Sequence, residues 1–135
     1  MQLVLDTNVV ISAFINPNGK PSQIIKLVLQ RSAALCYNSA ILNEYESVML
    51  RPKFSKIIDI GNVRQFINLI GNIGFSFSPL PSSINLPDDS DRIFYDTAKG
   101  SDSILISGNI EHSPKERFIM LPADFLKQLE SENKR

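Results

Sequence analysis

Short apolar runs alternate with longer amphipathic ones along this chain, and this alternation constrains the fold more than any other feature. The short runs are bounded by Gly, Pro, Asn or Asp and cover residues 2–6, 33–38, 75–80, 103–108 and 117–121. Because strands that alternate with helices usually form a parallel sheet, the pattern predicts an α/β fold with helices on both faces of the sheet.

The helical segments carry their own start and stop signals. They are expected over residues 23–31, 40–51, 63–74, 91–100 and 123–131, and the apolar stretch 9–15 can begin a further helix. Pro52 ends the helix at 40–51, and Pro122 suits the first turn of the last helix. The residues expected to cap the other helix starts are Ser22, Ser39, Asn62 and Ser90.

The length and composition of the chain predict one domain and argue against several classes of protein. The 135 residues are expected to form one domain over residues 1–130, followed by a frayed tail over 131–135. The 14 basic and 14 acidic side chains cancel, which argues against a polybasic nucleic-acid binder. The single cysteine fits a reducing cytoplasm. Neither a signal peptide nor a run of about 18 apolar residues is evident, so a membrane span is not expected.

Asp6 ends the first predicted strand, and the polar residues Thr7 and Asn8 follow it. Ligands of α/β proteins gather at the carboxyl ends of parallel strands. A carboxylate at this edge needs a cation or hydrogen-bond donors to offset its desolvation. Asp6 is therefore either a metal ligand or the N-cap of the following helix, and these residues alone favour neither.

Glu44 lies beside the apolar face of the predicted helix at 40–51, so its side chain is expected to be partly buried. A boundary glutamate whose carboxylate reaches water is the simpler interpretation. Glu46 lies past the opposite edge of that face.

A second group of acids, in the segment PDDSD at 87–91, stands directly before the helix at 91–100. Acids here complement the positive end of the helix dipole, which explains the run without an active site. The functional interpretation is that Asp91 projects from the helix start toward the strand ends. Asp96 lies about 140° further round the helix, so it is expected to be solvated or to act outside the direct ligand set. The preceding segment, 79–90, is expected to be an exposed loop.

Three carboxylates at one sheet edge would suit Mg²⁺ or Mn²⁺, which prefer oxygen ligands. Such an ion can activate water and stabilise a phosphodiester transition state. Competing sites are weak, because the single His, His112, and the single Cys, Cys36, supply no zinc constellation. The six glycines form no phosphate-binding loop.

Five blocks, LDTNVV, AILNEYESVMLRPKF, DDSDRIFYDTAKG, SILISGN and LPADFLKQL, together resemble the PIN domain family. The resemblance is to its VapC-like branch, the toxin components of bacterial toxin–antitoxin pairs, and extends from Leu3 to about Leu129. It implies a three-layer α/β/α fold with a central parallel sheet of about five strands. It also implies cleavage of single-stranded RNA with Mg²⁺ or Mn²⁺, often by a homodimer that a cognate antitoxin inhibits.

The resemblance also assigns roles to single residues. The three acids that hold the metal and act in catalysis fall on Asp6, Glu44 and Asp91, and a fourth acidic position falls on Asn109. A neutral amide can ligate but cannot offset cation charge, which weakens the case for a strongly held second metal. The residues expected to contact water, phosphate oxygens or the RNA backbone are Thr7, Asn8, Ser107, Arg51 and Lys53. For Arg51 and Lys53, a solvated surface cation is an equally good interpretation.

Other functions fit these residues less well. An aspartyl-phosphate phosphatase would carry a second Asp two residues after the first, where this chain has Asn8. A receiver-like domain would need an acidic pair near the first strand and a Lys at a late strand end. A non-catalytic PIN-type module that binds RNA or a protein partner stays open, because of Asn109 and the zero net charge.

Overall fold

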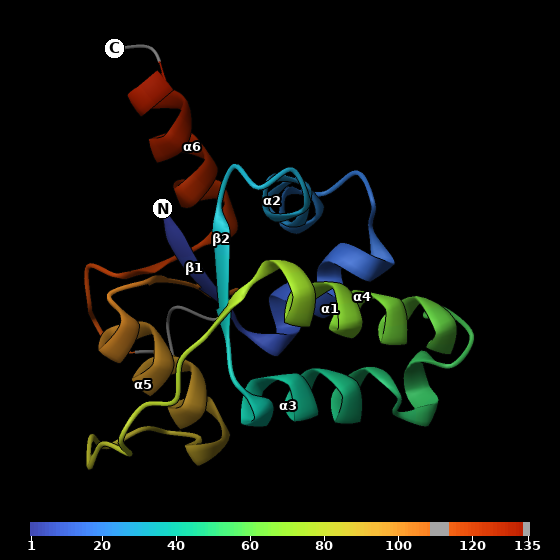
Figure 1. Ribbon diagram of the computed structural model, residues 1–135, viewed down its shortest axis with the longest axis horizontal. Helices are drawn as coiled ribbons and strands as arrows, with labels where there is room; N and C mark the ends of the chain where they lie inside the picture. The colour runs from blue at the N-terminus through green and yellow to red at the C-terminus, as the bar shows by residue number, and fades with distance from the viewer. Residues whose placement is uncertain (109–113, 134–135) are drawn as a thin grey trace.

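The computed structural model describes residues 1–108 and 114–133 and contains a parallel sheet between layers of helices (Figure 1). The five strands lie in the order β3-β2-β1-β4-β5, and every neighbouring pair is parallel. Their bounds are β1 Gln2–Leu5, β2 Ala34–Tyr37, β3 Phe75–Ser76, β4 Ile104–Ile106 and β5 Ile119–Met120. The predicted α/β/α fold and five-stranded parallel sheet are confirmed.

Helices α1 to α4 lie on one side of the strands and α5 lies on the other (Figure 1). The last helix, α6, packs against α2. The bounds are α1 Thr7–Ile15, α2 Lys20–Leu29, α3 Ser39–Met49, α4 Ile60–Ile73, α5 Arg92–Ser101 and α6 Pro122–Asn133. Two short 3₁₀ turns, η1 Pro52–Phe54 and η2 Asp89–Asp91, complete the described elements. That residues 1–130 form one domain stays a prediction.

Four predicted helix starts were wrong by one to three residues. The residues at the N-cap are Gly19, Asn38, Asp59 and Asp91, in place of Ser22, Ser39, Asn62 and Ser90. At α3 and α4 the cap is the extended residue directly before the helix, whose side chain accepts N–H groups of the first turn, and the predicted residue lies inside the helix. The predicted start at Pro122 is confirmed.

Tyr45 of α3 joins this helix to the central strand of the sheet. Its ring is fully buried between Phe66 and Phe94, with centroid distances of 6.4 and 6.2 Å. Its hydroxyl donates a hydrogen bond to the backbone carbonyl of Leu5, the last residue of β1. Because a buried carbonyl without a partner is costly, this contact fixes where β1 ends relative to α3.

Asn38 connects three segments that are far apart in the sequence. Its Oδ1 accepts the N–H of Ile41 at 2.9 Å and so caps α3. Its Nδ2 donates to the Thr97 hydroxyl in α5 at 2.9 Å and to the Phe77 carbonyl at 3.0 Å. Asn38 and Thr97 are both buried, so these bonds replace hydration that neither side chain retains.

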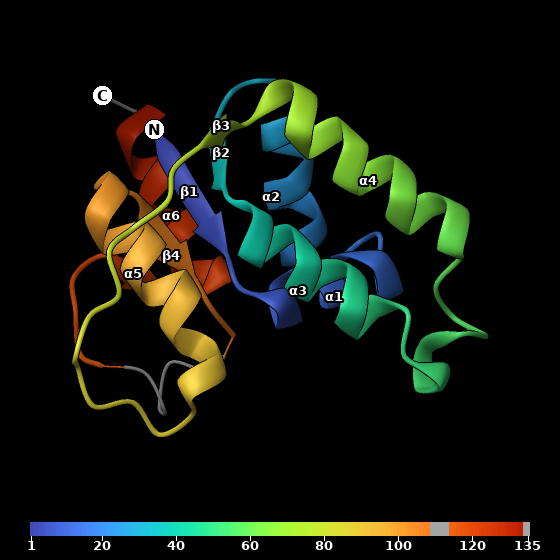
Figure 2. The same cartoon turned by 60° about the horizontal axis from the view of Figure 1, so that its bottom comes forward.

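The segment between β3 and η2 was predicted to be an exposed loop, which is only partly correct. It has no regular secondary structure, and Figure 2 shows it passing alongside α5. Burial alternates along it, with Ser82, Ile84 and Leu86 partly covered and the residues between them exposed. An extended backbone turns alternate side chains to opposite sides, so one side of the segment packs against the domain.

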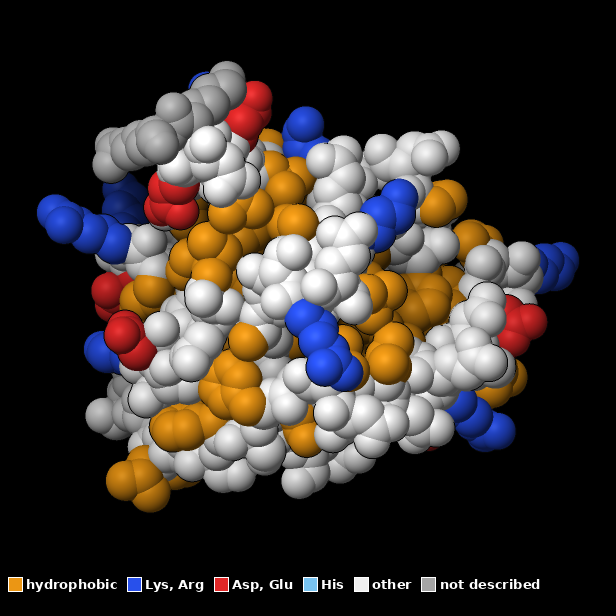
Figure 3. Space-filling model, turned by 45° about the horizontal axis from the view of Figure 1, so that its top comes forward, with side chains coloured by type: hydrophobic (Ala, Val, Ile, Leu, Met, Phe, Trp, Pro, Cys, Tyr) orange, Lys and Arg blue, Asp and Glu red, His pale blue; other side chains and the backbone are white. Residues whose placement is uncertain are grey.

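The surface carries scattered charges. On the face drawn in Figure 3, Lys and Arg side chains stand apart from one another among polar and apolar groups. None of the helices in the described part of the chain is both long and apolar enough to cross a membrane.

Replacing Asn38 by Ala is expected to lower the free energy of unfolding by about 2–4 kcal/mol, because α3 loses its cap and two buried groups lose their partner. Urea denaturation of the full chain measures this loss. Asn62→Ala, at an exposed position in α4, is the control and should change the value by less than about 0.5 kcal/mol. Equal losses in the two variants would contradict the structural role of Asn38.

Candidate active site

The three predicted acids lie around one cavity of about 390 Å³ at the carboxyl edge of the sheet, called here the acidic cavity. Asp6 comes from the end of β1, Glu44 from the middle of α3, and Asp91 from the last position of η2. The remaining lining residues are Thr7, Asn8, Val48, Arg51, Asp88, Ser90 and Phe94. The topology therefore brings together side chains that are 38 to 85 positions apart in the sequence.

Asp6 is the N-cap of α1 and also lines the acidic cavity. The sequence offered a helix cap and a metal ligand as alternatives, and the observed cap leaves the second alternative open. Its Oδ1 accepts the N–H of Val9 at 2.9 Å. Burial raises the pKa of the Asp6 carboxyl above its usual range. Hydrogen bonds that favour the ionised form oppose this effect, and their donors are the Ser107 side chain and the N–H groups of Val9, Gly108 and Asn8.

Asp91 experiences the charges of the other acids directly. Burial raises the pKa of its carboxyl, and the negative charges of Asp88, Asp6 and Glu44 raise it further. Glu44 is half-buried, as its position on the helix predicted. Charges of one sign around a common cavity repel each other, and a cation would relieve this repulsion.

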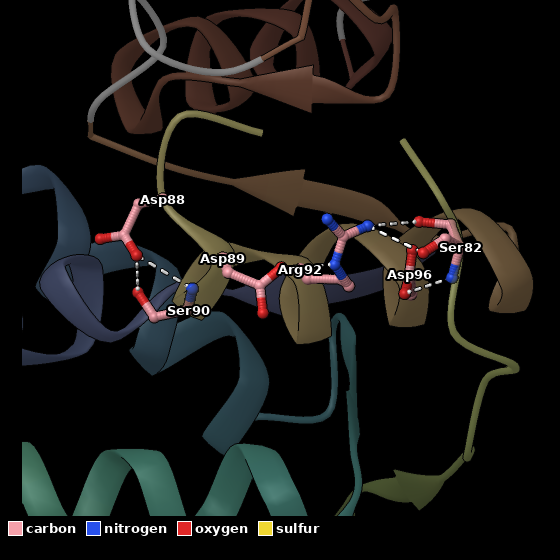
Figure 4. Close-up of polar contacts among 6 residues, drawn as sticks. All are labelled: Ser82, Asp88, Asp89, Ser90, Arg92 and Asp96. Carbon is pink, nitrogen blue, oxygen red and sulfur yellow. Dashed lines mark hydrogen bonds and ion pairs between the residues drawn. The ribbon is translucent and has the colours of Figure 1, made fainter. Parts of the chain in front are cut away.

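Hydrogen bonds shape the turn that carries Asp91 (Figure 4). Asp88 Oδ1 accepts both the N–H of Ser90 at 2.9 Å and its hydroxyl at 2.8 Å. The guanidinium of Arg92 donates from Nε to Asp89 Oδ1 at 2.7 Å. Asp88 and Asp89 are therefore held by different partners, although they are neighbours in the sequence.

Arg92 and Asp96 also attach this region to the preceding segment through Ser82. Arg92 Nη1 donates to the Ser82 carbonyl at 2.9 Å and to its hydroxyl at 3.2 Å. Asp96 Oδ2 accepts the N–H of Ser82 at 3.0 Å (Figure 4). Of the two alternatives predicted for Asp96, the solvated one was wrong, because its side chain is buried. A role outside the direct ligand set stays a prediction.

Thr7 lines the acidic cavity and carries an unusual buried polar atom. The residue is 8% exposed, and its Oγ1 is buried without a hydrogen-bond partner among the described residues. Nearly all buried polar atoms in proteins are paired, so this oxygen is one that a water, an ion or a phosphate group would satisfy.

The donor set fits a hard divalent cation that keeps part of its hydration shell. The cavity offers carboxylate, hydroxyl and amide oxygens, which Mg²⁺ and Mn²⁺ prefer. Among the described residues, no three His, Cys, Asp or Glu side chains are grouped closely enough to form a complete metal site. Because Mg²⁺ usually binds one or two carboxylates and several waters, such an ion still fits this arrangement.

The remaining predicted site residues differ in whether they line the acidic cavity. Asn8 and Arg51 line the acidic cavity, and Ser107 lines a smaller adjoining cavity of about 40 Å³ that shares Asp6, Asn8 and Asp91. Lys53 does not line the acidic cavity, and its ammonium lies 5.0 Å from the centre of the Phe54 ring. Asn109 and His112 lie outside the described residues.

Asp88 was not among the predicted site residues, although it lines the acidic cavity. The available signal was its position three residues before Asp91 in a short acidic segment. Two acids at this spacing face the same side only if the backbone turns, and the sequence does not reveal the η2 turn.

Comparison with known proteins identifies the family. A sequence model of the PIN domain matches residues 2–111, and the chain therefore belongs to the PIN domain family. The uncharacterized protein MJ1680 of Methanocaldococcus jannaschii is 30% identical over 110 residues, which cover 81% of this chain and 71% of that protein.

Two solved structures share the fold at low sequence identity. VapBC2 from Rickettsia felis, bound to a DNA fragment from its promoter, has a TM-score of 0.58 and 14% identity, covering 90% of this chain and 97% of that chain. VapBC-1 from nontypeable Haemophilus influenzae has a TM-score of 0.52 and 15% identity, covering 83% of this chain and 90% of that chain.

Without metal at pH 7, Asp6→Asn is expected to raise the melting temperature. Burial raises the pKa of Asp6 in the folded protein, so ionising this carboxyl costs more free energy in the folded state than in the unfolded chain. The ionised carboxylate therefore costs stability at neutral pH, whereas the amide keeps an acceptor for the N–H of Val9. The advantage of the variant should shrink as the pH falls through the raised pKa of folded Asp6, and should be lost below about 3.9, the ordinary pKa of aspartate.

Asp59→Asn provides the matched control for this measurement. Asp59 caps α4 on the exposed surface, and Asn is an equally good cap. Thermal melts of both variants across the pH range separate the effect of burial from the effect of changing a cap. A lower melting temperature for Asp6→Asn at pH 7 would contradict the expected cost of the buried charge.

Proposed function

We propose that this PIN domain protein is a metal-dependent endoribonuclease of the VapC-like toxin class, which hydrolyses phosphodiester bonds of single-stranded RNA. The observation that carries the proposal is the acidic cavity, which is lined by three carboxylates from distant segments and by Thr7, whose buried hydroxyl oxygen has no hydrogen-bond partner among the described residues. Membership of the family and the fold shared with two VapBC structures support it.

Asp6 and Asp91 would hold Mg²⁺ or Mn²⁺, and Glu44 would either ligate the ion or orient a water bound to it. Asn109 is the fourth proposed ligand. When bound, the ion would lower the pKa of a water and offset negative charge in the phosphodiester transition state. Attack by water on phosphorus breaks the bond to the 3′ oxygen, leaving a 5′-phosphate and a 3′-hydroxyl.

The other proposed contacts concern the RNA strand. Thr7, Asn8 and Ser107 would position water or phosphate oxygens through their side chains. Arg51 lines the acidic cavity, where its guanidinium can donate two parallel hydrogen bonds to a phosphate group. Lys53 would contact the RNA backbone outside this cavity.

The proposal extends to partners. VapC-like toxins pair with an antitoxin, so we propose a cognate antitoxin protein, a homodimer and a cytoplasmic location for this chain. The alternative is a catalytically weak or inactive PIN-type module that binds RNA or a protein partner. One feature of the sequence favours that alternative, because the residue at position 109 is Asn, where the resemblance to the family implies an acid.

Pure protein with Mn²⁺ is expected to cut a mixed-sequence single-stranded RNA, and Asp91→Asn should reduce the rate about 1,000-fold, the equivalent of about 4 kcal/mol of transition-state stabilisation. Gel analysis of end-labelled RNA measures the cleavage. EDTA should abolish it, and Asp59→Asn, a change of the same kind at a residue that does not line the acidic cavity, should preserve it. Cleavage by Asp91→Asn at the wild-type rate would reject the proposed site, and no cleavage of several RNAs would favour the binding module.

Millimolar Mg²⁺ or Mn²⁺ is expected to raise the melting temperature of the wild-type protein, because a ligand that binds the folded state stabilises it. Burial raises the pKa of Asp91 and the negative charges of Asp88, Asp6 and Glu44 raise it further, and a bound ion would relieve the repulsion among these charges. The increase should disappear in Asp6→Asn and Asp91→Asn and persist in Asp59→Asn. A wild-type melting temperature that does not respond to either metal would indicate a degenerate site.

A further inference from the structure

A second cavity, of about 380 Å³, adjoins the acidic cavity and shares Glu44 and Ser90 with it. It is lined by residues of α3, of α5 and of the irregular segment that passes alongside α5 (Figure 2). Because Pro79 and Pro81 of that segment form part of its wall, it is called here the proline cavity. The proposed metal site does not use this space.

We propose that the proline cavity is a base subsite, which takes the nucleobase of one RNA nucleotide next to the phosphodiester bond that is cut. This inference rests on the proposed ribonuclease function and deepens it, because it adds a site that selects the RNA sequence. Since the two cavities share Glu44 and Ser90, a strand with a phosphate in the acidic cavity would bring a neighbouring base to the proline cavity.

The size and the apolar part of the wall suit a nucleobase. Ligand sites in proteins have volumes of about 300–1,000 Å³, so the proline cavity has room for one base. Its apolar lining residues are Ala40, Pro79, Pro81 and Ile93. Every base has two apolar faces, and their burial against such side chains is favourable whatever the base.

Arg92 and Asp96 supply polar groups that can distinguish one base from another. Nε and Nη1 of Arg92 donate to Asp89 and Ser82, whereas Nη2 has no acceptor among the described residues (Figure 4). Asp96 Oδ2 accepts the N–H of Ser82, and within the same part of the chain Oδ1 accepts no hydrogen bond. Base edges differ in the order of their donors and acceptors, so a cavity with both kinds of group can select among them.

The charge of the lining favours a base over a phosphate group. Three acids, Glu44, Asp89 and Asp96, line the proline cavity together with one cation, Arg92, which leaves an excess of two negative charges. This excess repels the phosphates of the strand. A base is neutral and carries N–H donors that carboxylates accept, so it meets no such repulsion.

The wall that carries the two prolines is anchored on both sides of them. Before Pro79, the Phe77 carbonyl accepts from Asn38 Nδ2 at 3.0 Å, and a Cβ added at Gly100 would lie only 2.8 Å from the Phe77 ring. After Pro81, Ser82 is held by Arg92 and Asp96. The rings of the prolines also restrict their own backbone. A wall held in this way loses little conformational entropy when a ligand binds.

Ala40→Phe is the variant that tests the base subsite. Ala40 is the exposed second residue of α3, and it lines the proline cavity but not the acidic cavity. Helical side chains lean toward the start of their helix, so the added ring leans away from Glu44 and toward the prolines. Ala40→Leu adds a smaller group at the same position and is measured beside it.

Ala123→Phe is the matched control. Ala123 is the exposed second residue of α6 and lines neither cavity, so the variant adds the same ring at the same place in a helix.

The first measurement is the cleavage of a random-sequence pool of single-stranded RNA by the full chain with Mn²⁺, followed by sequencing of the cut ends. Wild type is expected to prefer one base at one position beside the cut by about 10-fold, the scale of one good base contact. Ala40→Phe should reduce this preference to less than about twofold and Ala40→Leu should reduce it partly, because both occupy the space of the base. Ala123→Phe should preserve it.

The second measurement is independent of cleavage. In EDTA, the fluorescence anisotropy of a labelled random RNA of about ten nucleotides reports binding, and Ala40→Phe should raise the dissociation constant about 10-fold. Ala123→Phe should leave the constant within about twofold of wild type.

The two measurements separate failure of the subsite from failure of the nuclease. Cleavage without a base preference, or with one that Ala40→Phe leaves unchanged, rejects the base subsite and leaves the nuclease intact. Wild-type protein that binds RNA without cutting it, with binding weakened by Ala40→Phe alone, rejects the nuclease and supports the subsite. Equal losses in Ala40→Phe and Ala123→Phe, or no RNA binding by wild type, reject the subsite.

Discussion

The cost of placing the Asp6 carboxylate at the end of a buried strand determines much of this structure. Leu3, Val4 and Leu5 are completely buried, so the chain reaches Asp6 without contact with water. The donors that offset the lost hydration come from the first turn of α1 and from residues 107 and 108 after β4. β1 pairs with β4 and continues directly into α1. This arrangement therefore places the hydrogen-bond donors of both segments around the Asp6 carboxylate.

The second requirement is to keep acids that repel each other in place around the acidic cavity. A turn that carried Asp91 on a loose loop would relax outward, because the charges of Asp88, Asp6 and Glu44 oppose its ionised form. The contacts of Ser82 with Arg92 and Asp96 prevent this by joining the start and the end of the 82–92 segment. The energy of these hydrogen bonds thus maintains a geometry that electrostatics alone would not favour.

The fold was predictable because strand-length and helix-length patterns alternate throughout the chain, and a half-buried Glu44 followed from its helical position. The helix starts were less predictable, because Asn38 and Ser39 are both good caps and the end of β2 decides between them. The burial of Asp96 could not be predicted, since its partner Ser82 lies 14 residues away in an irregular segment. Asp88 was missed for a similar reason, because its direction depends on a 3₁₀ turn that composition does not indicate.

The two outer strands of the sheet have a consequence for association with other chains. Both β3 and β5 are two residues long, and both pair on their inner side with longer strands. An edge this short offers few free backbone groups, so it is a poor template for an added strand from another molecule. The sheet is thereby protected against edge-to-edge aggregation, and a protein that binds this domain has to recognise helices and loops rather than extend the sheet.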